Sequence, residues 1–126
     1  MLNDYQIFAI GQIWPVLIVP LASTVLYWYL STTTNTTRRL LASAHGVLLL
    51  IAFVYAVAVS PMTGYETWEA WIWPFWILLA LFLVAILYAI TRYEGNRWIH
   101  MFQLLVLPSG FLIWLVGTMT ITHDWL

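Results

Sequence analysis

The sequence feature that most constrains this chain is a run of 21 residues, 71–91, without a charged side chain: WIWPFWILLALFLVAILYAIT. A helix that rises about 1.5 Å per residue crosses a bilayer core of about 30 Å in about 20 residues. An uncharged apolar helix of this length would be insoluble in water. We therefore predict that the run spans a membrane.

The charged residues divide the rest of the chain into similar runs. Only 7% of the 126 residues are charged, whereas a soluble domain carries about a quarter. Neutral runs lie at 5–37, 40–65, 70–91 and 98–123. They predict an all-α integral membrane protein, a single domain over 1–126, with a four-helix transmembrane bundle. The expected spans are 8–30, 40–60, 71–91 and 98–120.

The signs of the charges predict an orientation. All four arginines lie in the first and third connections, and four of the five acids lie beyond the opposite ends of the spans. Because arginine-rich loops stay in the cytoplasm, we expect both termini outside, in the inner membrane of a bacterium. Aromatic residues at the span ends, such as Tyr93, are expected to anchor the helices at headgroup level. The topology anchors are Arg38, Arg39, Arg92 and Arg97.

A weak internal repeat relates the two halves of the chain. Trp14-Pro15 recurs 59 positions later as Trp73-Pro74, and Arg38 recurs as Arg97. The repeat predicts two duplicated helical hairpins in the same orientation, related by an axis along the membrane normal.

The second and fourth predicted helices carry stripes of small and polar residues at alternating spacings of three and four. The second stripe is Ala42, His45, Leu49, Ala52 and Ala56. The fourth is His100, Gln103, Leu107, Gly110, Trp114, Gly117 and Ile121. Small residues let helix backbones approach, and polar side chains then bond across the contact. We expect helix packing or pore lining from Ala42, Ala52, Ala56, Gln103, Gly110 and Gly117.

His45 and His100 are the candidate cofactor ligands. An ionisable group inside a membrane is costly and suggests a function. Two imidazoles on the inward faces of parallel helices suit the axial ligation of haem b or of one transition metal. Structural hydrogen bonding or a proton relay would use the same residues. His123, beside Asp124, is expected to be a solvated tail residue.

Several classes of function are excluded by missing residues. The chain has no cysteine, which removes disulfide, thiolate-metal and cysteine-nucleophile chemistry. No acid lies inside a predicted span, so the membrane carboxylate of a proton-coupled small multidrug transporter is missing. The charge pattern also lacks the basic footprint of a nucleic-acid-binding protein.

We therefore expect a non-enzymatic membrane subunit that acts by helix–helix association within the lipid bilayer. It would work as a homo-oligomer, with or without a pore, or as an accessory subunit of a larger membrane complex. The alternative is a redox subunit that binds haem b through His45 and His100. A third hypothesis is a small transporter built from duplicated hairpins.

Overall fold

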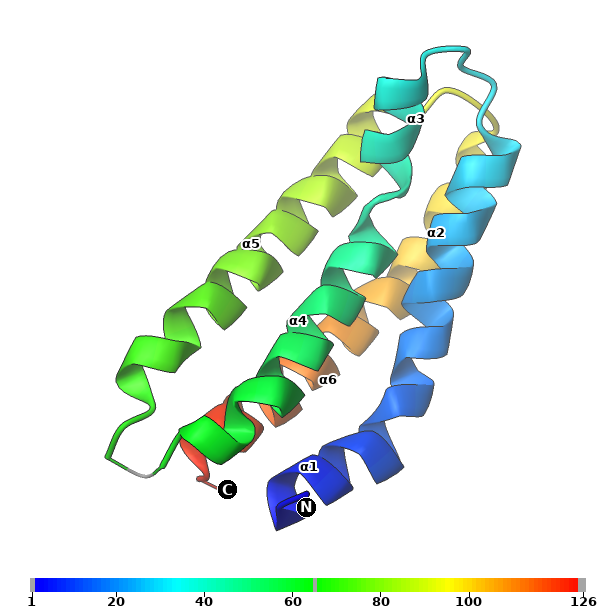
Figure 1. Cartoon of the computed structure of the whole chain (residues 1–126). Coiled ribbons are helices and arrows are strands. Elements are labelled where there is room, and N and C mark those ends of the chain that lie inside the picture. The colour runs from blue at the N-terminus through cyan, green and yellow to red at the C-terminus, as the bar shows by residue number, and fades with distance from the viewer. Residues whose placement is uncertain (1, 65, 125–126) are drawn as a thin grey trace.

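A computed structural model describes residues 2–64 and 66–124, and in that part of the chain all regular structure is helical (Figure 1). The first long helix combines α1 (Asp4–Phe8), the π-helical η1 (Ala9–Ile13), the 3₁₀ turn η2 (Trp14–Leu17) and α2 (Ile18–Leu30). The second combines α3 (Thr36–Ser43), α4 (His45–Val59) and η3 (Ser60–Met62). The third is α5 (Glu69–Arg92), and the fourth combines η4 (Arg97–Phe102) with α6 (Gln103–Thr122).

Four helical stretches are long and apolar enough to cross a membrane, as predicted: Asp4–Leu30, His45–Met62, Glu69–Arg92 and Arg97–Thr122. The first begins four residues earlier than the expected 8–30. Its start is fixed by a capping box, in which the Asn3 side chain accepts from the Gln6 amide (2.8 Å) and the Gln6 side chain accepts from the Asn3 amide (3.0 Å).

The second predicted span, 40–60, is not one continuous helix. α3 begins at Thr36, because the Asn35 side chain accepts from the Arg38 amide at 3.2 Å, and it ends at Ser43. A break at Ala44 separates α3 from α4. No proline lies near this break, and Gly46, two residues after Ala44, lies inside α4.

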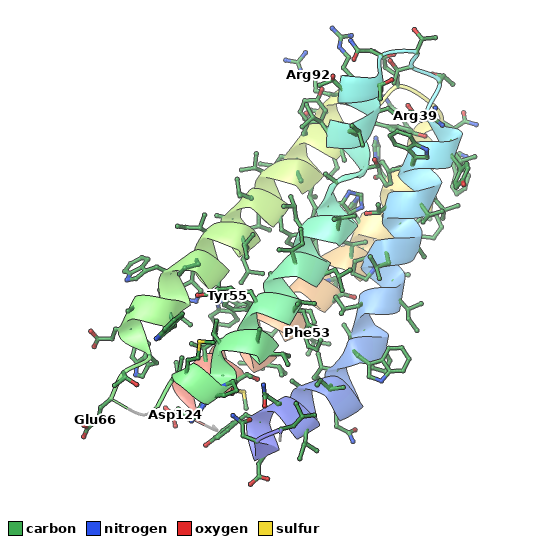
Figure 2. All side chains as sticks on the ribbon, in the orientation of Figure 1. Arg39, Phe53, Tyr55, Glu66, Arg92 and Asp124 are labelled. Carbon is green, nitrogen blue, oxygen red and sulfur yellow. The ribbon has the colours of Figure 1, made fainter. Side chains whose placement is uncertain are left out.

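Both termini and the α4–α5 connection lie at one end of the molecule, which we call the terminus end (Figure 1). The α2–α3 and α5–α6 connections lie at the other, the arginine end; Figure 2 shows Arg39 and Arg92 there, and Glu66 and Asp124 at the terminus end. The two connections at the arginine end are joined by the Thr32 amide, which donates to the Glu94 carbonyl at 2.8 Å.

The middle of the interior is apolar and is packed around glycines. The rings of Phe75 and Phe82 lie against Gly117 and Gly110, leaving no room for a Cβ at either glycine. The six residues expected to pack helices or line a pore are all buried inside this one chain: Ala42, Ala52, Ala56, Gln103, Gly110 and Gly117.

Two members of the fourth stripe do not face inward. Leu107 and Trp114 are 43% and 40% exposed, and the buried face runs instead through Val106 and Ile113. Both flanks of the Gly110–Gly117 line are apolar, so the stripe pattern did not distinguish them. The large Trp114 side chain has more room on the outer surface than beside the phenylalanine rings.

Gly46 lies where α2 and α4 approach each other closely, so adding one methyl group there is expected to destabilise the fold. A Cβ at Gly46 would meet the Pro20 carbonyl and the Thr24 hydroxyl, and the Gly46 amide already donates to Thr24 Oγ1 at 2.8 Å. Because backbone cannot yield as a side chain does, Gly46→Ala is expected to lower the free energy of unfolding by about 1–3 kcal/mol.

The matched control for this prediction is Gly11→Ala. A Cβ at Gly11 has nothing within 4 Å, so this variant is expected to be as stable as the parent chain or slightly more stable. Unfolding followed by tryptophan fluorescence in detergent micelles compares the two variants. Equal stability of both would contradict the close packing of α2 against α4.

Candidate functional site

Six polar side chains from the four long helices and their connections meet near the arginine end. α2 supplies two of them, α4, η4 and α6 supply one each, and one follows the end of α5. We call this group the Tyr27 cluster: Ser23, Tyr27, His45, Tyr93, His100 and Gln103. All are buried except His100, which is half-buried.

Tyr27 lies at the centre of the cluster. Its hydroxyl lies 2.8 Å from His100 Nδ1 and accepts a hydrogen bond from Gln103 Nε2 at 3.0 Å. Because the phenol oxygen accepts from Gln103, we assign its own proton to a hydrogen bond to His100 Nδ1, which assigns the imidazole proton to Nε2. One hydroxyl therefore joins α2 to η4 and to α6.

Aromatic contacts extend from the same ring. The Tyr27 ring meets the rings of His45 and Tyr93 edge-on, with centroids 5.0 Å apart in each case. It lies 5.8 Å from the His100 ring. Offset and edge-on arrangements are the favoured geometries for aromatic pairs, so the ring packs productively on all three neighbours.

His45 is bound mainly to α2. Its Nε2 lies 2.9 Å from the Ser23 hydroxyl, and the adjacent Gly46–Thr24 hydrogen bond makes a second link between the same two helices. Ser23 and Tyr27 are four residues apart and so lie on one face of α2. This spacing of two polar residues within an apolar helix is the pattern in the sequence from which their position in the cluster could have been predicted.

Four buried polar atoms of the cluster have no hydrogen-bond partner among the described residues: His45 Nδ1, the Tyr93 hydroxyl, His100 Nε2 and Gln103 Oε1. An unpaired buried polar group costs about 1–3 kcal/mol, so each is a place where water or a ligand atom would bind favourably. Burial raises the pKa of the Tyr93 phenol, and the nearby charge of Arg39 acts in the opposite direction. No carboxylate belongs to the cluster.

The two histidines do not fit the axial ligation of a haem in this arrangement. A haem iron bound by both would have to lie between the two imidazoles, where the Tyr27 ring contacts each of them. His45 Nε2 is also engaged by Ser23. Among the described residues, no group of three or more His, Asp or Glu side chains is placed to hold a metal ion.

Arg39 has a structural position beside the cluster, whereas the other three arginines are more open. Its Nε donates to the Trp28 carbonyl at 2.7 Å, and its guanidinium lies 4.5 Å from the centroid of the Trp28 ring. These contacts attach α3 to the end of α2. Arg38, Arg92 and Arg97 are exposed.

A second polar cluster lies at the terminus end and includes His123. We expected this residue to be a solvated tail residue, but the structure packs it against other helices. Its ring stacks on Tyr5 with centroids 4.3 Å apart, and its Nε2 lies 2.9 Å from the Ser60 carbonyl. The Tyr5 hydroxyl donates to the His123 carbonyl at 2.8 Å, and the Ser60 hydroxyl donates to the Thr120 carbonyl at 3.0 Å. The partners are too far apart in sequence for any periodicity to connect them.

The hydrogen bonds of Tyr27 predict a measurable loss of stability in Tyr27→Phe. Removing the hydroxyl leaves His100 Nδ1 and the Gln103 amide without their shared partner inside the protein. We expect the free energy of unfolding to fall by about 1 kcal/mol, the usual size for hydrogen bonds between membrane helices. Tyr29→Phe is the control, because Tyr29 is 73% exposed. A denaturant titration that finds both variants equally stable would exclude a central role for Tyr27.

No protein-family model, no curated protein and no solved structure matches this chain. The residues of the chain itself are therefore the evidence on its function, and the Tyr27 cluster is one of two sets of polar side chains that the described helices bring together.

Proposed function

We propose that the protein is a non-enzymatic integral membrane subunit that acts by association, with copies of itself or within a larger membrane complex. One observation supports this most directly: most buried polar side chains of the spans gather toward the two ends, while the interior between them is packed and, apart from Ser109, largely apolar. The association would therefore use the outer surface of the helices.

The apolar interior argues against a path through a single copy. The buried side chains between the two polar clusters are mostly apolar, and include Leu49, Ala52, Phe53, Ala56, Phe75, Leu79, Phe82, Val106 and Ile113. The buried Ser109 hydroxyl already donates to the Leu105 carbonyl at 2.9 Å. Moving an ion or a polar solute past these side chains would expose it to hydrocarbon-like surroundings without hydrogen-bond partners. A pore, if the protein makes one, would lie between copies, and the hypothesis of a monomeric transporter has no support here.

The small residues of the two stripes are not available for contact with another copy or subunit. They are occupied by the chain's own helices, as with Phe75 against Gly117. What remains outside is a surface of large apolar side chains on every span, for example Val25, Ile51, Leu83 and Phe111. Association would depend on shape matching between such surfaces, because lipid tails are as apolar as these side chains.

Orientation and ancestry belong to the same proposal. We propose that the arginine end faces the cytoplasm and that both termini face outward, in a bacterial inner membrane.

We also propose that the two hairpins arose by duplication. In support, α4 begins at His45 and α6 at Gln103, each after a separate helical segment, and these starts agree within one residue under the 59-position shift. The first helices differ, since Pro15 follows a π-helical segment whereas Pro74 lies inside a continuous α5.

Association is testable by cysteine crosslinking, because the chain has no native cysteine. Single cysteines at Val25, Ile51, Leu83 and Phe111 place one thiol on the exposed face of each span. We expect one of these variants to form a disulfide-linked dimer, or a link to a copurified subunit, that persists when the membrane is diluted with added lipid. Leu49→Cys is the control, since Leu49 is fully buried and its thiol is expected to stay free.

A single outcome would overturn the association proposal. It is a protein that stays monomeric by mass in a bilayer mimetic, retains no partner through mild purification, and gives no crosslink at any of the four outward positions.

Orientation is testable with a cysteine in the first connection. Thr34→Cys lies at the arginine end, between α2 and α3. We expect a membrane-impermeant maleimide to label it in inverted membrane vesicles but not in intact cells. Labelling in intact cells would show that the proposed orientation is inverted.

A further inference from the structure

Three of the four arginines of the chain line a single polar pocket at the arginine end. The pocket has a volume of about 510 Å³ and is formed where α3, the end of α5 and the start of η4 approach one another. It is lined by Arg38, Tyr88, Thr91, Arg92, Tyr93, Glu94 and Arg97. The pocket is separate from the association surface proposed above.

The pocket carries an excess of positive charge. Arg38 pairs with Glu94 at 3.3 Å, and this is the only carboxylate in the lining. Arg97 donates to the Ile90 carbonyl at 3.4 Å, which orients its guanidinium without neutralising it. The Arg92 guanidinium has no hydrogen bond or ion pair among the described residues. Two guanidiniums therefore remain available to an anion.

Tyr93 forms part of the wall of the same pocket. It is 3% exposed, and its hydroxyl has no exposed surface because its ring packs on Tyr27 and His100. The donors that an anion in the pocket would meet are therefore the guanidiniums. Two unpaired guanidiniums in one pocket are strong donors for an oxyanion.

The pocket also lies at the ends of two membrane-length helices, where lipid headgroups are expected. It is bounded by the last residue of one membrane-length helix, Arg92, and by the first residue of another, Arg97. Tyr29 and Trp98, at the same end of the molecule, are 73% and 53% exposed, as interfacial aromatic residues are. A lipid phosphate lies at this level beside the protein, and a guanidinium fork matches its oxygens in pairs.

We propose that Arg38, Arg92 and Arg97 bind the phosphate of an anionic phospholipid at the arginine end. The guanidiniums of Arg92 and Arg97 hold the phosphate, and Glu94 limits the affinity by competing for Arg38. Basic pockets between membrane helices are suited to anionic headgroups for these electrostatic reasons.

The test measures the thermal stability of the protein, purified in an uncharged detergent, on titration with phosphatidylglycerol or phosphatidylcholine. We expect phosphatidylglycerol to raise the Tm saturably and phosphatidylcholine to have little effect. Arg92→Gln and Arg97→Gln are each expected to weaken the apparent affinity about fivefold, from roughly 1 kcal/mol per arginine near a charged membrane surface. Each variant is compared with its own Tm in the absence of lipid.

Two glutamate variants provide a matched pair. Glu94→Gln and Glu66→Gln each remove one negative charge, but Glu66 lies at the terminus end (Figure 2). We expect Glu94→Gln to bind phosphatidylglycerol more tightly because it frees Arg38, and Glu66→Gln to bind like the parent chain. If both variants gain equally, the attraction is a general effect of net charge and the pocket is not a site.

A titration with inorganic phosphate distinguishes binding of a lipid phosphate from binding of a free phosphate ion. If millimolar phosphate alone produces the full rise in Tm and abolishes the effect of phosphatidylglycerol, the pocket binds a free anion and the lipid assignment is wrong. Equal stabilisation by both lipids would overturn the proposal altogether.

Discussion

The structure depends on one constraint: a polar group inside a bilayer has no water to bind, so its partner must come from the protein. In this chain the solution is concentrated in a few side chains. The Tyr27 hydroxyl serves both His100 and Gln103, and Ser23 serves His45. Because these pairs connect residues far apart in sequence, they determine which helices are neighbours and at what height. The packing of the apolar middle then follows from that register.

This division between polar ends and an apolar middle also limits where the protein can bind partners. Phenylalanine rings fill the space above Gly110 and Gly117, so the small residues contribute to the interior of one molecule. The features that remain open to partners are the outer surface and the charged pocket at the arginine end. The proposed association and the proposed phosphate site therefore occupy different parts of the same small protein.

The sequence was most informative where single residues carry large energies. A charge in hydrocarbon is so costly that the positions of nine charged residues located four membrane-length helices. It was less informative where alternatives are close in energy. Leu107 and Val106 both fit an apolar stripe, and only the packing of the folded helices buries Val106 and leaves Leu107 43% exposed.

Part of the candidate site was predicted from the sequence, again where a single residue is energetically costly in a membrane. His45 and His100 were identified because an ionisable residue in a span is rare, whereas Tyr27 passed as one aromatic residue among many. Tyr93 was expected to be an interfacial anchor, and its contact with Tyr27 depends on the fold of the α5–α6 connection. His123 and Ser60 interact across 63 positions, a distance over which a single sequence provides no pattern. Such pairings are products of the tertiary structure.

The contacts at the terminus end also have a consequence for the order of assembly. The Tyr5 hydroxyl binds the carbonyl of His123, and the Gln6 side chain binds the carbonyl of Val57 at 2.7 Å. During synthesis, residues 5 and 6 leave the ribosome long before residue 123 does. The N-terminal turn can attach to α4 once the first hairpin is inserted, but it can stack on His123 only after the fourth span has been made. Insertion of these helices therefore ends with the closure of one polar cluster by residues from both ends of the described chain.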